Sequence, residues 1–170
     1  MEDADPLILT AAFDPVSARM FGELRERHFP ARLNIVPAHL TLFHHLPGRD
    51  VAAVLANLRA EAGPVLPFTT GVLKFLGRGV AVEILCPPLA ALRGRLAAVW
   101  GTELTAQDRQ GFRPHVTVQN KVTAAEARAT MTRLADGVSG LPGTIVGLDL
   151  WWYRGGPWER AGEVRWPAAG

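Results

Sequence analysis

The sequence predicts an α+β domain with two lobes, and three observations support this prediction. Strand-like and helix-like segments alternate along the 170 residues. One short motif occurs twice, beginning at His39 and again at His115. Each copy follows a predicted helix and is followed, after a short loop, by another helix. We therefore expect a duplicated α+β unit whose two lobes face each other about a pseudo-two-fold axis.

The composition is that of an ordinary globular protein. Hydrophobic residues make up 48% of the chain and charged residues 20%, so a sizeable core can form and nothing indicates disorder. This length fits one domain, which we take to span residues 1–170. The net charge of +2 is too small for a basic coat that binds long nucleic acids. An anionic substrate would have to be attracted by a local patch.

Cysteine content and hydropathy indicate where the protein is found. Cys86 is the only cysteine, which excludes an internal disulfide and a cysteine-based metal site. Residues 1–5 are acidic and lack the positive start of a signal peptide. No apolar run approaches the length of a membrane span. We expect a cytoplasmic monomer that does not enter membranes, and the sequence points to no protein partner.

In the first half of the chain, capping and turn residues separate the predicted elements. Asp14-Pro15 ends an apolar run, and Asp14 or Ser17 can cap the helix that follows. Pro30 ends that helix, and Asp50 is a candidate N-cap for the next one. Gly77-Arg78-Gly79 joins two strand-like runs into a hairpin. The predicted elements are strand 7–13, helix 15–27, strand 39–46, helix 51–62, and strands 68–76 and 80–85.

The second half follows the same logic. Pro87-Pro88 opens a third helix, and Thr123 with Glu126 forms a capping box for a fourth. A polar loop at 105–111 precedes the second motif. Gly155-Gly156-Pro157 turns the chain between the last two strands. The predicted elements are helix 88–101, strand 115–119, helix 124–136, and strands 144–153 and 158–166.

The repeated motif reads His39-Leu40-Thr41-Leu42 and His115-Val116-Thr117-Val118, with a proline shortly before each copy. In a β-strand, residues i and i+2 point the same way, so each copy places a histidine and a threonine on one face. One such tripeptide pattern is weak evidence of function because it also occurs by chance. Two matched copies, which hold two of only five histidines, are much stronger evidence.

These side chains suit acid–base cleavage of a phosphodiester. One imidazole can take a proton from the attacking oxygen while the other gives a proton to the leaving oxygen, because the pKa of histidine lies near neutrality. The threonine hydroxyls can donate hydrogen bonds to the non-bridging phosphate oxygens. This scheme requires no metal and no other cofactor.

The paired motifs resemble the double signature of the two-histidine (2H) phosphoesterase superfamily, which includes RNA 2′-5′ ligase-like proteins and cyclic nucleotide phosphodiesterases. The resemblance implies two lobes of antiparallel sheet with outer helices and a central cleft. It implies that His39 and His115 are the catalytic pair and that Thr41 and Thr117 bind the phosphate, without indicating which histidine is the base. The implied enzyme is a metal-independent phosphodiesterase or transesterase that acts on 2′,3′-cyclic or 2′-5′ phosphodiesters of nucleotides or RNA ends.

One position departs from the family pattern. Many members carry an aromatic residue five places after the first motif histidine, where this chain has His44, and the aromatic residue here is Phe43, one place earlier. Strand alternation puts Phe43 on the same face as Thr41, which makes it a candidate for the pocket wall. Alternation also predicts that His45 lines the rim of the cleft and that His44 packs beneath a helix.

Further residues near the motifs have open roles. Arg113 and Lys121 can each offer charge to a phosphate, although solvation at the surface explains them equally well. Tyr153 or Trp152, in the closing hairpin, can stack on a nucleobase, whereas core packing accounts for most aromatic residues there. A metal site built from His44 and His45 with the motif histidines is the weaker alternative, because no carboxylate or cysteine with ligand spacing joins them.

A second function class uses the same cleft. The chain could be a non-catalytic RNA- or nucleotide-binding module that keeps the motifs but turns over no substrate. The small net charge does not favour this alternative for long RNA, because phosphate binding draws on clustered lysines and arginines.

Overall fold

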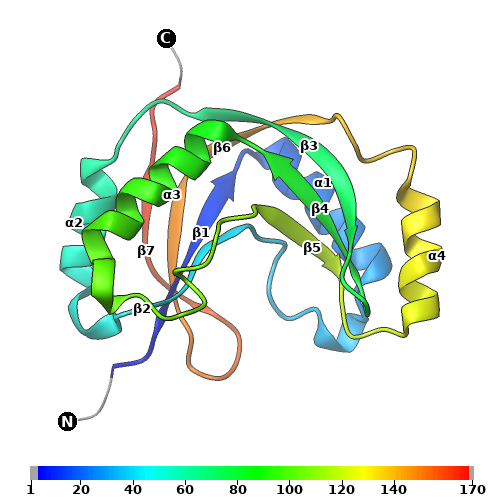
Figure 1. Cartoon of the computed structure of the whole chain (residues 1–170), viewed down its shortest axis with the longest axis horizontal. Helices are drawn as coiled ribbons and strands as arrows, with labels where there is room; N and C mark the ends of the chain where they lie inside the picture. The colour runs from blue at the N-terminus through cyan, green and yellow to red at the C-terminus, as the bar shows by residue number, and fades with distance from the viewer. Residues whose placement is uncertain (1–3, 169–170) are drawn as a thin grey trace.

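The computed structural model describes residues 4–168, so part of the acidic start, residues 1–3, lies outside the described residues. In the described part, seven strands and four α-helices alternate as predicted (Figure 1). The strands are β1 (Leu7–Phe13), β2 (Thr41–Leu46), β3 (Leu66–Phe75), β4 (Val80–Leu85), β5 (His115–Gln119), β6 (Pro142–Trp152) and β7 (Glu159–Arg165). The helices are α1 (Pro15–His28), α2 (Val51–Ala60), α3 (Pro87–Trp100) and α4 (Ala124–Leu134).

All the strands belong to one antiparallel sheet. Its order is β2-β1-β6-β3-β4-β5, and β7 also pairs with β6. Strand β6 joins the two halves: β3 pairs with its start, Pro142–Ile145, while β1 and β7 pair with the rest of it. The predicted α+β class, with an antiparallel sheet and outer helices, is confirmed. The sheets of the two halves are continuous with each other through β6.

The predicted duplication is visible as two strand–helix–strand units, β1-α1-β2 and β4-α3-β5. In each unit the second strand returns antiparallel beside the first. The motif stands where the return strand begins, because His39 lies two residues before β2 and His115 is the first residue of β5. Helix α1 packs against β5, which belongs to the other unit. In Figure 1, α1 and α4 lie on the half of the molecule that carries β3, β4 and β5, whereas α2 and α3 lie on the opposite half.

The predicted caps form and fix where the helices begin. The carboxylate of Asp14 accepts hydrogen bonds from the N–H groups of Val16 and Ser17, and also from the N–H of Thr144 in β6. Asp50 caps α2 and Thr123 caps α4 in the same way. Because one carboxylate serves both α1 and β6, the cap at Asp14 also ties the helix to the central strand.

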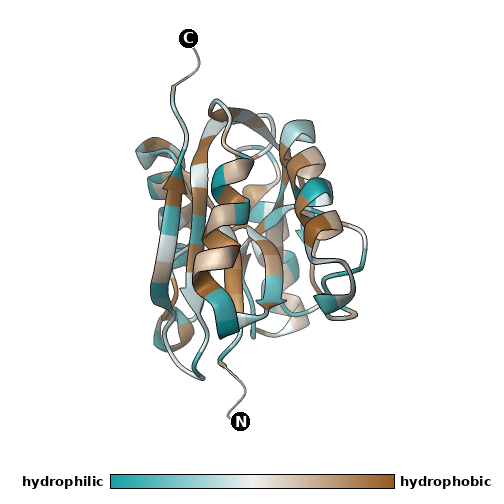
Figure 2. Ribbon diagram, turned by 90° about the vertical axis from the view of Figure 1, so that its left-hand side faces the viewer, coloured by the Kyte–Doolittle hydropathy of each residue, from teal (hydrophilic) through white to brown (hydrophobic). Residues whose placement is uncertain are grey.

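The core lies between the sheet and the helices, and it is built from the apolar stripes of both. Hydrophobic and hydrophilic residues succeed each other along the strands and helices in Figure 2. Phe13, Phe21 and Phe68 form an aromatic cluster under α1, with ring centroids 5.0 to 6.2 Å apart. No helix in the described part of the chain is both long enough and apolar enough to span a membrane.

Strand β2 breaks the regular alternation of a strand. Its pairing with β1 runs Leu7↔Leu46, Leu9↔Phe43 and Thr10↔Thr41, so β2 carries an extra residue in each of two steps. Such bulges turn the following side chains to the other face. Leu42 and Phe43 are therefore both buried. His44 and His45, which come next, are both exposed.

The bulges overturn three predictions that rested on strict alternation. Phe43 is fully buried, packs edge-on against Trp100 in the core and does not form a pocket wall. His44 is not packed beneath a helix, because 49% of its side chain is exposed and it lines a pocket together with Thr41. His45 lines a separate hollow beside Pro47 rather than the rim of the cleft.

Candidate functional site

The two motif histidines are held in the same way. The Nδ1 atom of His39 lies 2.8 Å from the carbonyl oxygen of Pro37, and Nδ1 of His115 lies 2.9 Å from the carbonyl oxygen of Arg113. A ring nitrogen beside a carbonyl donates to it, so Nδ1 carries the proton in both rings. In each histidine, Nε2 is therefore the nitrogen left to exchange a proton with a substrate.

His39 lies in an environment that keeps it neutral. Its ring packs against Trp158, with ring centroids 4.6 Å apart and planes inclined by 56°. Burial lowers the pKa of His39 from 6.5 to about 4, against the opposing effect of the Pro37 carbonyl, and the charges of Arg25, His115 and His44 lower it further. At neutral pH the free protein therefore presents His39 with an unprotonated Nε2.

Arg25 fixes the second motif strand from the opposite unit. It is only 4% exposed, and its Nη1 donates to the carbonyl oxygen of Thr117 at 3.0 Å. Its Nε donates to Oδ1 of Asn34, and its guanidinium lies 3.9 Å from the centre of the Phe29 ring. The sequence offered only one weak indication that Arg25 is buried: its position on the helix lies beside the apolar stripe that includes Phe21.

Arg93 of α3 fixes the first motif strand, as Arg25 fixes the second. Its Nε donates to the carbonyl oxygen of Leu42 at 3.2 Å, and its guanidinium lies 4.3 Å from the centre of the Phe43 ring. Its Nη2 donates to the carbonyl oxygen of Asp108, which ties the loop before β5 to β2. Each unit thus supplies a buried arginine that holds the motif strand of the other unit.

Asp108 organises the residues that follow the first motif. The carboxylate is fully buried and accepts hydrogen bonds from the main-chain N–H groups of His44 and His45, at 2.8 and 2.9 Å. It also accepts one from Nδ1 of His44 at 3.2 Å. Burial raises the pKa of Asp108, but the hydrogen bonds from His44 and His45 outweigh burial and lower it below its ordinary value. The buried carboxylate is therefore ionised at neutral pH.

A pocket of about 340 Å³ lies between the two motifs. It is walled by the loop before β5 and by the start of β2, so it brings Thr41 and His115 together. The polar and charged residues that line it are Thr41, His44, Arg93, Gln107, Asp108, Gln110, Arg113 and His115. The two halves of the duplication thus share one pocket that contains groups able to donate protons and hydrogen bonds.

Comparison with known proteins identifies the family. A family model described as the 2′-5′ RNA ligase superfamily matches residues 12–157. The chain belongs to this superfamily. No curated protein matches the sequence.

Solved structures share the fold of this member of the superfamily at low sequence identity. The structure of TT0787 from Thermus thermophilus is 16% identical, has a TM-score of 0.65, and the match covers 97% of this chain and 100% of that one. A structure described as a phosphoesterase is 17% identical, with a TM-score of 0.60 and coverage of 96% and 99%. The apo form of LigT from E. coli is 16% identical, with a TM-score of 0.59 and coverage of 96% and 98%.

The two aromatic residues that the sequence offered for stacking on a nucleobase, Tyr153 and Trp152, do not line the pocket beside His115. Tyr153, 46% exposed, follows β6 and is not among the residues that line the pocket beside His115. Trp152 packs under the guanidinium of Arg154. The aromatic residue beside a motif histidine is instead Trp158, which the sequence showed only as one of several in the closing hairpin.

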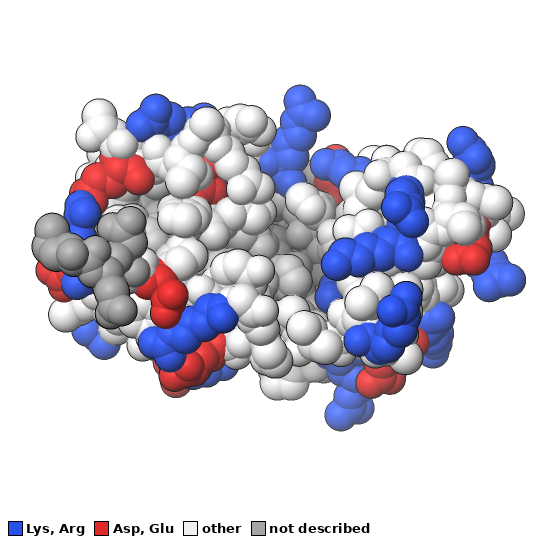
Figure 3. Space-filling model, turned by 90° about the horizontal axis from the view of Figure 1, so that it is seen from below, with Lys and Arg blue, Asp and Glu red and all other residues white. Residues whose placement is uncertain are grey.

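Arg113 and Lys121, the two basic residues predicted to offer charge to a phosphate, lie at opposite ends of β5. Arg113 lines the pocket near His115, whereas Lys121 is exposed in the turn that follows the far end of the strand. Lys and Arg side chains gather on the half that carries α4 in Figure 1, as the view from below shows (Figure 3). On the other half, arginines are paired with carboxylates, as in Arg49–Glu103, Arg95–Glu61 and Arg160–Asp149.

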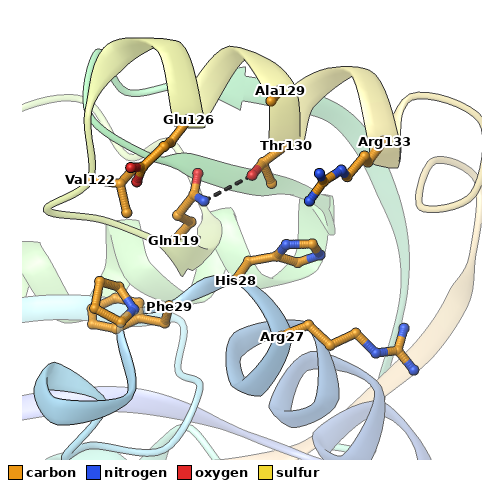
Figure 4. A pocket seen from close by; sticks show the side chains of 10 residues that line it. Arg27, His28, Phe29, Gln119, Val122, Glu126, Ala129, Thr130 and Arg133 are labelled. Atoms are coloured by element: carbon orange, nitrogen blue, oxygen red, sulfur yellow. Dashed lines mark hydrogen bonds between the residues drawn. The ribbon is translucent and has the colours of Figure 1, made fainter.

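Another hollow, of about 430 Å³, lies between the end of α1 and α4 (Figure 4). Arg27 and His28 line it from α1, and Arg133 lines it from α4. Burial lowers the pKa of His28, and the charges of Arg133 and Arg27 lower it further. Gln119 donates to the Thr130 hydroxyl at the base of this hollow.

Within residues 4–168, no group of three or more His, Cys, Asp or Glu side chains is arranged to hold a metal ion.

Proposed function

We propose that this protein is a metal-independent phosphodiesterase or transesterase that acts on 2′,3′-cyclic or 2′-5′ phosphodiesters of nucleotides or RNA ends. The observation that carries the proposal is the matched pair of histidines. His39 and His115 each bond through Nδ1 to a main-chain carbonyl of their own segment, and each keeps Nε2 free. Two imidazoles with free Nε2 atoms are what a concerted proton transfer to and from oxygen requires.

His39 takes the role of general base in this proposal. Its pKa of about 4 leaves Nε2 unprotonated at neutral pH, so it can accept the proton of the attacking hydroxyl or water. The attacking oxygen then forms a bond to phosphorus while the bond from phosphorus to the ribose oxygen breaks. His115 donates a proton from Nε2 to that leaving oxygen. Each histidine is expected to contribute about 10²–10⁴-fold to the rate.

The motif threonines hold the phosphate. Thr41 lines the pocket beside His115, and we assign its hydroxyl and that of Thr117 as donors to the two non-bridging oxygens. Arg25 keeps Thr117 in place through the main-chain carbonyl. Removing one such preorganised donor typically costs about 10²–10³-fold in kcat.

Known structures support a nucleotide substrate. Solved structures of LigT from E. coli hold 3′-AMP, phosphate, NADP+ and ATP, and that protein shares the fold of this chain. The arginines and lysines on the half that carries α4 provide a positive field for an RNA end. We also propose that residues 1–170 act as one domain and as a monomer in the cytoplasm, consistent with a single, buried cysteine.

The test is turnover of a panel of nucleoside 2′,3′-cyclic phosphates, measured across pH and with a chelator present. We expect a bell-shaped pH–rate profile that survives chelation, and a loss of at least about 10²-fold in kcat for His39→Ala and for His115→Ala. His45→Ala is the matched control, because this histidine is exposed and lines a different hollow.

Each other outcome has a definite reading. If both motif variants keep full activity, two-histidine catalysis is wrong. Tight binding of cyclic nucleotides without turnover would favour the alternative, a non-catalytic RNA- or nucleotide-binding module. Loss of activity with the chelator would favour a metallohydrolase.

A further inference from the structure

The pocket beside His115 is lined by more side chains able to bind a phosphate than the proposed function uses for the scissile phosphodiester. A phosphodiester carries a single negative charge, and the proposed function already gives it the two motif threonines and the catalytic histidines. Of those four side chains, Thr41 and His115 line this pocket, and His44 and Arg113 line it in addition. Within the described residues, Arg113 forms no ion pair with a carboxylate, so its charge is available to a ligand.

His44 is held in the pocket by local structure. The bulges in β2 turn it outward, and Asp108 fixes both its main-chain N–H and its ring. The hydrogen bond from Nδ1 to the Asp108 carboxylate leaves Nε2 as the free nitrogen of a side chain that lines the pocket. The ring of this exposed histidine is therefore oriented by a fully buried carboxylate.

The side chains of His44 and Arg113 together favour a phosphate ligand. An imidazole nitrogen that donates to a phosphate oxygen makes a charge-assisted hydrogen bond, because the acceptor is ionised. Arg113 adds a guanidinium, which matches the oxygens of a phosphate in a bidentate manner. The proposed function assigns neither His44 nor Arg113 to the phosphodiester that is cleaved.

We propose that the pocket beside His115 binds a second phosphate of the substrate, held by His44 and Arg113, with Asp108 as the residue that positions His44. This second phosphate is the one on the 5′ side of the terminal nucleotide. The inference rests on the proposed function, because it takes the scissile phosphodiester to lie at His39 and His115.

The test compares three substrates that share the same terminal cyclic phosphate: a nucleoside 2′,3′-cyclic phosphate, its 5′-phosphorylated form, and a dinucleotide that ends in the same group. For the wild-type protein, we expect kcat/KM to rise at least about tenfold when a 5′-side phosphate is added, the scale of one charge-assisted hydrogen bond. If kcat/KM rises for both the 5′-phosphorylated nucleotide and the dinucleotide, the site binds a terminal phosphate as well as a phosphodiester. A gain with the dinucleotide alone assigns it to an RNA chain.

The variants report on the ratio of kcat/KM between substrates with and without the second phosphate, so a general loss of activity does not affect the readout. We expect His44→Gln and Arg113→Gln each to remove most of the gain, mainly through KM. His45→Gln is the matched control: it neighbours His44, meets Asp108 through its main-chain N–H and lines another hollow, so its ratio should equal that of the wild type.

Failure of this inference can be distinguished from failure of the proposed function. If the wild-type protein turns over the unphosphorylated nucleotide and the second phosphate brings no gain, the second-phosphate site is wrong while the catalytic proposal stands. The site is also wrong if the gain persists in His44→Gln and in Arg113→Gln. If the wild-type protein turns over none of the three substrates, both proposals are wrong.

Discussion

Arg25 of α1 donates a hydrogen bond to the carbonyl oxygen of Thr117, 3.0 Å away, across the boundary between the two duplicated units. Arg93 of α3 makes the reciprocal contact with Leu42 in β2. Each motif strand is therefore held by a helix that belongs to the other unit. This exchange explains how two segments far apart in sequence are kept in register around one pocket.

Replacing Arg25 with Met should uncouple the second motif strand from α1. The carbonyl of Thr117 and the amide of Asn34 would lose their partner in a partly buried place, at a cost of about 1–3 kcal/mol in the free energy of unfolding. We also expect a fall in kcat, because Thr117 would be less well positioned. Urea denaturation and steady-state kinetics measure the two effects. Arg19→Met, on an exposed part of the same helix, should change neither; an Arg25 variant as stable as the wild type would contradict the bracing role.

Trp158 controls the ionisation of His39 in our interpretation. Trp158→Ala should expose the imidazole to water, so the pKa of His39 should rise from about 4 toward 6.5, since burial is the main cause of its depression. If His39 is the base, the acidic limb of the kcat/KM profile should move to higher pH with it. NMR titration of the ring protons measures the pKa directly. Tyr153→Ala, at an exposed aromatic residue away from the pocket, is the control, and an unshifted His39 would refute the role of Trp158.

Asp108 should contribute stability that depends on pH. Its folded-state pKa lies below the ordinary value of 3.8, so its contribution is fully present above about pH 4 and is lost as the pH falls through the folded-state pKa. At pH 7, Asp108→Ala should cost about 1–3 kcal/mol or more, because the buried N–H groups of His44 and His45 lose their acceptor. Urea denaturation at pH 7 and pH 3 should show the gap between variant and wild type narrowing in acid. A gap that is independent of pH would contradict the ionised state.

His28 should report the positive field in the hollow between α1 and α4. Arg133→Ala removes one of the charges that depress its pKa, so the pKa of His28 should rise. Because the folded-state pKa is depressed, protonation of His28 opposes folding below about pH 6.5, and the variant should lose less stability there than the wild type. Ring-proton NMR titration measures the shift. Arg128→Ala, on the same helix with its guanidinium over Phe75, should leave the pKa of His28 in place.

Much of the fold could be predicted from the sequence because its signals are local. Asp14, Asp50 and Thr123 cap the helices as expected, and the strands follow from apolar runs bounded by turn residues. The duplication was visible because the two histidine motifs keep their spacing and their place after a helix. These features depend on propensity and periodicity, which a single sequence carries.

The surroundings of the motifs could not be predicted in the same way. Strict alternation fails in β2 because two extra residues are accommodated there, and only the pairing with β1 reveals them. Arg25, Arg93 and Asp108 are buried charges, a rare class whose partners lie far away in sequence. Charged side chains in helices and polar loops are mostly solvated, so no local pattern placed these three beside the motifs.

The continuity of the sheet through β6 has a mechanical consequence. Both motif strands belong to one hydrogen-bonded surface, so the distance between the two histidines depends on the coiling of that surface, not on a flexible tether between separate bodies. Narrowing the gap around a substrate would require several strands to bend together, a stiff deformation spread over many bonds. In the proposed mechanism, this stiffness means that little free energy is spent on changing the distance between the two imidazoles when a ligand binds.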